Sequence, residues 1–428
     1  MRKLTLDTSP LRKYRELRLL FASGMITRLG SAMTMVALPF QIKVLTNSYI
    51  AVGLMGIVQL VPLIIFGLYG GVLADSVDRK KMILLAESSS LLMTLILFGN
   101  ALLPNPHIVI LYFVGAAFAA LSGLSAPSLG AILPRIVSSE DMSASNALMG
   151  LRWQVGALIG PSIGGLIVST AGVATGYALD VTSYVLSLIF ISLLKPVPPG
   201  EKSVPPSLKS LIDGLQYAVS RKDLLGTYLV DLAAMFFAMP TALFPFWADS
   251  LNARWALGLF YSAGTVGAII TTLTSGWMKH YAHHGRAVMW AAIGWGASIS
   301  LAGTFNSLFT VLLFLTLAGA FDEVSALFRS LMWNQSIADE YRGRLGGIEV
   351  LSYSVGPLGG QMRAGSMAAW TNLRTSVVSG GLLCIGFVVL AAASLPKFRK
   401  YDARTNEYVL SKEREANNSP ENYLGRTC

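Results

Sequence analysis

Long apolar stretches recur along the whole chain, and no other feature of the sequence constrains the fold as strongly. A helix that crosses a bilayer needs about 20 mostly apolar residues. Stretches of this kind lie at 18–46, 51–73, 82–103, 107–133, 144–170, 174–194, 224–248, 256–278, 287–304, 308–333, 345–369 and 375–395. Only 13% of the residues are charged, whereas a soluble domain carries about 25%. We therefore expect an all-α integral membrane protein with twelve transmembrane helices in the lipid bilayer.

Lysine and arginine are concentrated at both ends of the chain and in every second connection between the apolar stretches. Cytoplasmic loops carry this excess in membrane proteins. The pattern predicts two cytoplasmic termini and a multi-pass protein of the bacterial inner (cytoplasmic) membrane, which we expect to be a monomer. Because the basic residues form no stripe or groove, the net charge of +10 does not indicate nucleic-acid binding.

The longest connection divides the predicted spans into two sets of six. It is rich in proline and then shows apolar residues at helical spacing from Leu208 to Val219, which predicts an amphipathic helix on the membrane surface. We expect an N-terminal bundle (1–194), this linker (195–222), a C-terminal bundle (223–396) and a polar cytoplasmic tail (397–428). The sequence from Gly160 to Gly165 is echoed from Gly356 to Gly360, six spans later. Parallel repeats of this kind are typical of transporters with a solute path between two bundles.

Several motifs resemble those of the major facilitator superfamily. The segment from Gly71 to Lys81 is similar to its signature loop, although Ser76 and Asp78 depart from the pattern. The fifth-span motif beginning at Gly156 resembles that of exporters in the superfamily. Segments 36–48 and 70–104 are similar to siderophore exporters of the enterobactin type, and macrolide-efflux members share much of this pattern. The resemblance covers about 15–395 and implies two pseudo-repeated six-helix bundles that form a transporter, not an enzyme.

Ionisable side chains inside the predicted spans are the candidates for transport chemistry, because each costs at least ~2.5–3.5 kcal/mol at the bilayer centre. The resemblance implies that spans one, four, seven and ten line the cavity. It therefore places around the solute the following residues: Arg28, Asp231, Asp322, Glu323 and Arg329. Asp322, Ser325 and Arg329 share one helix face. We expect the solute to bind at these positions: Arg28, Arg329, Ser325 and Trp333.

Proton coupling is expected at the acidic members of this set, Asp322, Glu323 and Asp231. Burial raises the pKa of a carboxylic acid and a neighbouring arginine lowers it, so an anionic solute beside arginine changes the affinity for protons. The alternative is a static charge network that holds helices together. Arg152 and Glu349, at similar positions in paired spans, favour such a structural role.

Two further sets of residues are candidates for conformational gating. Asp75 and Arg79, in the signature-like loop, are expected to clasp neighbouring helix ends. Gly156, Gly160 and Gly164 repeat every four residues beside Pro161, which indicates either a hinge or close helix packing.

The functional hypothesis is proton-coupled export of a small organic solute, of the enterobactin-siderophore type, from cytoplasm to periplasm. Broad macrolide or drug efflux and a non-transporting membrane receptor on a transporter fold are the alternatives. No cofactor is expected, because no nucleotide-binding GxxxxGK[ST] motif occurs. No metal site is expected either, because His280, His283 and His284 have no acidic or cysteine ligand nearby in the sequence.

Overall fold

The structure is a computed structural model that describes all residues except 1–6, 77, 198–215, 338, 407–408 and 412–428. The side chains at 68, 70–76, 126–131 and 339–352 also lie outside the description. The helices of the first half are α1 (Ser9–Lys13), α2 (Arg15–Thr46), α3 (Tyr49–Ser76), α4 (Arg79–Ala101), α5 (Ile108–Ile136), α6 (Met142–Ala171) and α7 (Val173–Ser192). Those of the second half are α9 (Lys222–Ala238), α10 (Phe244–Ser250), α11 (Leu257–Thr274), α12 (His284–Thr304), α13 (Leu308–Ser336), α14 (Asp339–Trp370), α15 (Leu373–Ser394) and α16 (Pro396–Arg399).

The prediction of an all-helical membrane protein is confirmed. Among the described residues, 11 helical segments are long and apolar enough to cross a membrane. The remaining expected span, 345–369, falls within the 32-residue helix α14. Local turn chemistry sets the boundaries between these helices. Asn47, in the left-handed conformation with φ 47°, ends α2, and Asp78 caps α4 by accepting a hydrogen bond from the Lys81 amide.

The seventh span differs from the continuous helix expected over 224–248. Helix α9 ends at Ala238, and a 3₁₀ turn, η1 (Thr241–Leu243), precedes α10. Pro240 explains the break, since proline has no amide hydrogen to donate within a helix. Arg363 of α14 donates hydrogen bonds to the carbonyl oxygen of Phe237, near the end of α9, and to that of Ser376 at 3.0 Å. The break is therefore supported by a side chain from another helix.

The two glycine-proline motifs pack in the same way in the two halves. A Cβ atom on Gly160 of α6 would collide with Ala32 of α2, and one on Gly164 would collide with the Met33 backbone. In the second half, a Cβ atom on Gly360 of α14 would collide with the backbone of Met235 in α9. Each motif thus brings its helix into close contact with the first long helix of its own half, α2 or α9.

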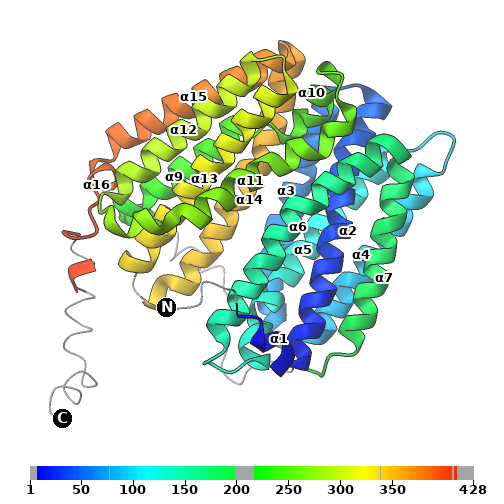
Figure 1. Cartoon of the computed structure of the whole chain (residues 1–428), viewed down its shortest axis with the longest axis horizontal. Helices are drawn as coiled ribbons and strands as arrows, with labels where there is room; N and C mark the ends of the chain where they lie inside the picture. Colours follow the sequence, from blue (N-terminus) through cyan, green and yellow to red (C-terminus); the bar gives the residue numbers. More distant parts are fainter. Residues whose placement is uncertain (1–6, 77, 198–215, 338, 407–408, 412–428) are drawn as a thin grey trace.

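The halves form a V whose apex lies near α10 (Figure 1). Contacts between them occur at the end of the molecule where α2 finishes and α3 begins. Gly53 of α3 packs against Gly365 of α14, and Gly165 of α6 packs against Gly258 of α11.

An ion pair joins the two halves at this same end. Lys43 of α2 pairs with Asp249 of α10, and Asp249 also binds Arg254 at 2.6 Å. The end of the V that carries this ion pair is called the closed end. The opposite end, where α1 and α16 lie, is called the terminal end.

Both described chain ends are anchored at the terminal end. Lys13 and Tyr14 bind Asp141, in the connection between α5 and α6, at 2.6 and 2.8 Å. After α15, Phe398 and Tyr401 are buried against the second half, so the expected polar tail starts with a docked segment. The predicted amphipathic helix at 208–219 lies largely outside the described residues.

Candidate functional site

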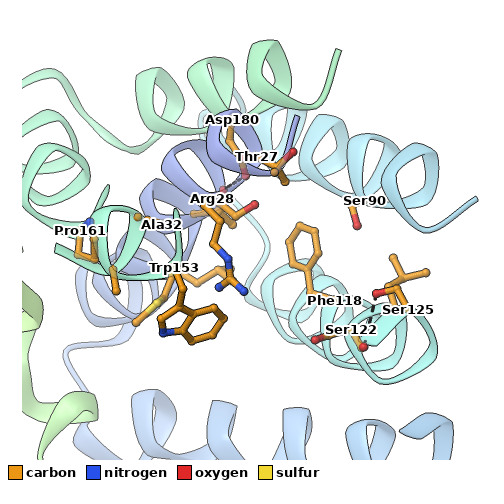
Figure 2. Close-up of a pocket in the computed structure, with 18 of the residues that line it drawn as sticks. Thr27, Arg28, Ala32, Ser90, Phe118, Ser122, Ser125, Trp153, Pro161 and Asp180 are labelled. Atoms are coloured by element: carbon orange, nitrogen blue, oxygen red, sulfur yellow. Dashed lines mark hydrogen bonds between the residues drawn. The ribbon is translucent and has the colours of Figure 1, made fainter. Parts of the chain in front are cut away.

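A cavity of about 760 Å³ lies mainly within the first half of the molecule (Figure 2). Helices α2 to α7 supply most of its lining, and η1, α11 and α14 complete it toward the closed end. Leu20, Ile83 and Ile191 line it near the terminal ends of α2, α4 and α7. The cavity thus extends from the terminal end toward the contacts that join the halves, and its volume falls in the range of ~300–1,000 Å³ typical of small-molecule sites.

Arg28 and Trp153 form an aromatic-cationic shelf in the cavity. The guanidinium carbon of Arg28 lies 3.5 Å from the centre of the Trp153 ring, a cation–π arrangement. Arg28 is exposed and Trp153 is 55% exposed. Figure 2 shows both side chains on one side of the cavity, with Phe118 and Ser122 of α5 across from them. A flat ring placed between them would meet an aromatic surface, a positive charge and a hydroxyl group.

Glu87 and Arg152 lie deeper toward the terminal end of the same cavity. The Thr27 hydroxyl donates a hydrogen bond to Glu87 Oε2 at 3.3 Å. Arg152 Nη1 donates to the Leu20 carbonyl oxygen at 3.1 Å, and the charges of Glu87 and Arg152 interact.

Glu87 was not among the expected site residues, although it is an acidic residue within the predicted span 82–103. The cost of a charge at bilayer depth, which drew attention to the other candidates, applies equally to it.

Asp180 of α7 also borders the cavity, but it is already satisfied by protein groups. Its side chain is 0% exposed and accepts hydrogen bonds from the Thr34 hydroxyl and, at 3.1 Å, from the Ser183 hydroxyl. This arrangement ties α7 to α2 and gives Asp180 a structural role.

The charged cluster of the second half lies apart from this cavity. Asp231 of α9 and Arg329 of α13 form an ion pair in which the side chains are 3% and 2% exposed. Asp322 is near enough for its charge to interact with both, and Glu323 accepts a hydrogen bond from Thr272 at 2.9 Å. None of these four residues lines the cavity.

The remaining expected solute contacts in the second half are also packed within the protein. Ser325 is 5% exposed. The indole nitrogen of Trp333 donates to the Thr227 hydroxyl at 2.9 Å, and its ring stacks on Tyr228 at 5.2 Å. Of the four residues expected to bind solute, Arg28 lines this cavity and Arg329, Ser325 and Trp333 do not.

The candidate gating residues occupy two environments. The side chain of Asp75 lies outside the described residues, and Arg79 is buried, with its amide bonded to the Val197 carbonyl oxygen at 3.1 Å. Its neighbour Lys80 donates to the carbonyl oxygens of Ser192 and Leu194 at 2.7 and 2.5 Å. Lys80 thus caps the C-terminal end of α7.

The exporter-like glycines of α6 face α2 at the wall of the cavity. A Cβ atom on Gly156 would lie 3.0 Å from the Arg28 Cβ atom, and Gly156 and Pro161 both line the cavity. These contacts favour close packing, and they also place the motif directly behind the Arg28 backbone. Within the described part of the chain, no group of three His, Cys, Asp or Glu side chains is arranged to hold a metal ion.

Comparison with known proteins identifies the family. Residues 6–419 match the family described as "Transmembrane secretion effector". The enterobactin exporter EntS of Shigella boydii serotype 18 and that of Escherichia coli O81 are each 30% identical to this chain over 399 residues, covering 92% of this chain and 96% of the relative.

Solved structures show the same fold at low sequence identity. A POT family transporter in complex with 5-aminolevulinic acid has a TM-score of 0.71 at 14% identity, covering 90% of this chain and 97% of that chain. A bacterial homologue of the lysosomal transporter Spinster, in an inward-facing and unoccupied conformation, also has a TM-score of 0.71 at 14% identity, over 92% and 100% of the two chains. The chain therefore belongs to the transmembrane secretion effector family and is a secondary transporter with the major facilitator fold, not an enzyme.

Proposed function

We propose that this protein exports a small aromatic solute of the enterobactin-siderophore type from cytoplasm to periplasm by alternating access, driven by protons. The observation that carries the proposal is the exposed Arg28 guanidinium stacked on Trp153 inside the cavity. Electron-rich or anionic rings bind well to such a surface, because the cation attracts them and the indole offers a flat apolar face. The relatives named as enterobactin exporters support the same solute class.

The proposed direction of transport rests on the difference between the terminal end and the closed end. With both termini in the cytoplasm, as the distribution of basic residues predicts, the cavity faces the cytoplasm and the closed end faces the periplasm. A solute made in the cell then enters the cavity directly. Separation of the halves at the Lys43–Asp249 pair opens the route to the periplasm across the inner membrane. The candidate proton-coupling acids derived from the sequence are Asp322, Glu323 and Asp231.

Broad drug efflux is the second candidate, because part of the cavity is apolar and adaptable. Met35, Met55 and Met239 line it together with Phe118 and Leu121, and methionine side chains adjust their shape to different ligands. Siderophore export requires a solute with a hydroxylated or anionic ring, whereas broad drug efflux does not.

Transport by purified protein in liposomes tests the proposal. We expect a pH gradient to drive iron-free enterobactin across the membrane, and we expect Arg28→Ala and Trp153→Ala to weaken its binding on the order of tenfold each, since a desolvated cation–π contact contributes about 1–2 kcal/mol. Trp290→Ala is the matched control, because Trp290 is 62% exposed and does not line the cavity. Transport of macrolides with equal or greater efficiency, unaffected by Arg28→Ala, would favour broad efflux.

A further inference from the structure

We propose that Glu87 is the group at which protons and solute compete, and that Arg152 is the residue that positions its charge. The inference rests on the proposed export function and deepens it. It transfers the coupling step from the second half of the molecule to the cavity of the first half.

The surroundings of Glu87 make it the acidic group of the cavity that is ready to exchange partners. The Thr27 hydroxyl donates a hydrogen bond to its carboxylate at 3.3 Å, which is long for a hydroxyl donor, and the Ser187 hydroxyl also lies close to it. By contrast, Asp180 in the same cavity is fully buried and is held by the hydroxyl groups of Thr34 and Ser183. Glu87 is half-buried and lines the cavity directly, so a solute group can replace Thr27 with little rearrangement.

The charged and titratable groups that act on Glu87 or feel its charge are Arg152 of α6, and Asp180 and Tyr184 of α7. Arg28 of α2 lines the same cavity and lies near Arg152. The described lining from α5 consists of Phe118, Leu121, Ser122 and Ser125 and adds no charge. Two cations thus balance the two acids when both acids are ionised.

Neighbouring residues fix the position of the Arg152 side chain. Its Nη1 atom is tied to the Leu20 carbonyl oxygen at 3.1 Å. Gly24 leaves the space in which the guanidinium group sits, because a Cβ atom at Gly24 would overlap it. The Nε atom of Arg152 is buried and has no hydrogen-bond partner within the described residues. The guanidinium group of Arg152 is therefore fixed, and its Nε–H group can still donate a hydrogen bond. It can stay close to the Glu87 carboxylate while that carboxylate changes its hydrogen-bond partner.

Competition follows from the hydrogen-bonding capacity of a carboxyl group. An ionised carboxylate only accepts hydrogen bonds, and it forms charge-assisted bonds with hydroxyl donors that are about twice as strong as neutral ones. A hydroxylated solute therefore binds ionised Glu87: the protonated side chain gives up its proton to the open side of the membrane, and the solute O–H group takes its place. When the cavity faces the other side, a proton returns to the carboxylate and the solute leaves. One proton enters for each solute released, which is the exchange that export requires.

The acids of the second half are less suited to direct competition. Asp231 is already paired with Arg329 in a site that is 2–3% exposed, and Asp322 and Glu323 do not line the cavity. A proton that binds there does not meet a solute in this cavity.

The pH dependence of binding tests the inference. We expect the affinity of the wild-type protein for iron-free enterobactin to fall on the order of tenfold per pH unit below the midpoint of the profile, as for competition with one proton. Glu87→Gln should give a flat profile, and Glu87→Asp should restore the slope. Arg152→Gln should move the midpoint to higher pH, because loss of a nearby cation favours the neutral carboxyl group. Asp402→Asn is the matched control, because Asp402 does not line the cavity, and it should keep the wild-type profile.

A second measurement needs no solute. Acidification of the purified protein should produce the infrared band of a protonated carboxyl group, and this band should be smaller in Glu87→Gln than in Asp402→Asn. A pH profile and an infrared band that are unchanged in Glu87→Gln overturn the inference and leave export intact. Absence of enterobactin binding in the wild type contradicts the proposed solute instead, and the infrared comparison then decides the role of Glu87.

Discussion

The two halves of the molecule place the same kinds of charged side chain in opposite environments. In the first half, Arg28 and Glu87 face a cavity and keep surfaces free for a ligand. In the second half, Asp231 and Arg329 face each other and are 3% and 2% exposed. A buried ion pair gains its stability only while both partners remain, whereas a charge in a wet cavity stays solvated. The comparison supports the proposal that the solute binds in the first half, and the ion pair of the second half holds helices α9 and α13 together.

The largest expected effect comes from breaking the buried pair. Arg329→Leu removes the cation that faces Asp231 and should lower the free energy of unfolding by ~3–5 kcal/mol. Arg28→Leu should change the same quantity by no more than ~0.5 kcal/mol, because this side chain is exposed. Unfolding of both variants in detergent micelles measures the contrast. Equal destabilisation would mean that the two halves do not differ in the way described.

The next effect concerns the glycine motifs, where the halves are expected to agree. Gly160→Leu and Gly360→Leu each force a side chain against a facing helix and should lower the free energy of unfolding by ~1–3 kcal/mol through overpacking. Gly99→Leu is the control, since nothing lies within 4 Å of a Cβ atom there. A variant that unfolds like the wild type but no longer transports would instead support the hinge interpretation of the motif.

A smaller effect is expected at the closed end, where the halves meet. Lys43→Ala removes the cation that joins Asp249 to the first half and should favour separation of the halves by about 1 kcal/mol, or roughly fivefold in population. Distances between spin labels at the ends of α2 and α11 measure this population. Arg254→Ala removes a cation on the same half as Asp249, so it should leave the balance nearly unchanged. Equal shifts of the distances in both variants would show that the Lys43–Asp249 ion pair does not hold the two halves together.

The smallest effect is a pH dependence at the terminal end, where each half anchors a chain end through an aspartate. Hydrogen bonds from Lys13 and Tyr14 hold the pKa of Asp141 below its usual value. Asp402 pairs with His283 of the second half at 3.0 Å, and hydrogen bonds from Arg404 hold the pKa of Asp402 below its usual value. Because both values are lowered in the folded protein, the stabilisation is present above the pKa of an unfolded aspartate and is lost as the pH falls through the folded value.

The protection of backbone amides near α1 and after α16, measured against the intrinsic exchange rate at each pH, should therefore fall in acid at both anchors. Asp141→Asn should make protection near α1 low at every pH, without changing protection after α16. Persistent protection near α1 in this variant would show that other contacts hold the segment.

The sequence predicts the helices well because lipid imposes a simple length and polarity rule on them. The expected spans 107–133 and 308–333, for example, correspond to α5 and α13 within a few residues. The break after Ala238 was not predicted, since it depends on Pro240 together with an arginine from α14. Burial of Phe398 and Tyr401 was also not foreseen, because two aromatic side chains in a polar segment give no periodic pattern.

The candidate site is harder to derive because a charge within a span does not reveal what it faces. Arg28 and Arg329 look alike in the sequence, yet only tertiary contacts decide that the first lines a cavity and the second pairs with Asp231. Glu87 could have been selected by the same rule that selected Asp322. We expected a structural role for Arg152, but its side chain lines the cavity, where a hydrogen bond to the Leu20 carbonyl oxygen fixes its guanidinium group.

The double attachment of Asp249 affects how readily the transporter can change shape. Because Arg254 binds both carboxylate oxygens from the same half, at 2.6 and 3.1 Å, Asp249 remains neutralised after Lys43 withdraws. Separating the bundles at the closed end therefore leaves Asp249 paired with Arg254 and exposes the Lys43 side chain to water. The electrostatic barrier to each turnover stays low, and the seal can re-form after every cycle without capturing a new counter-ion.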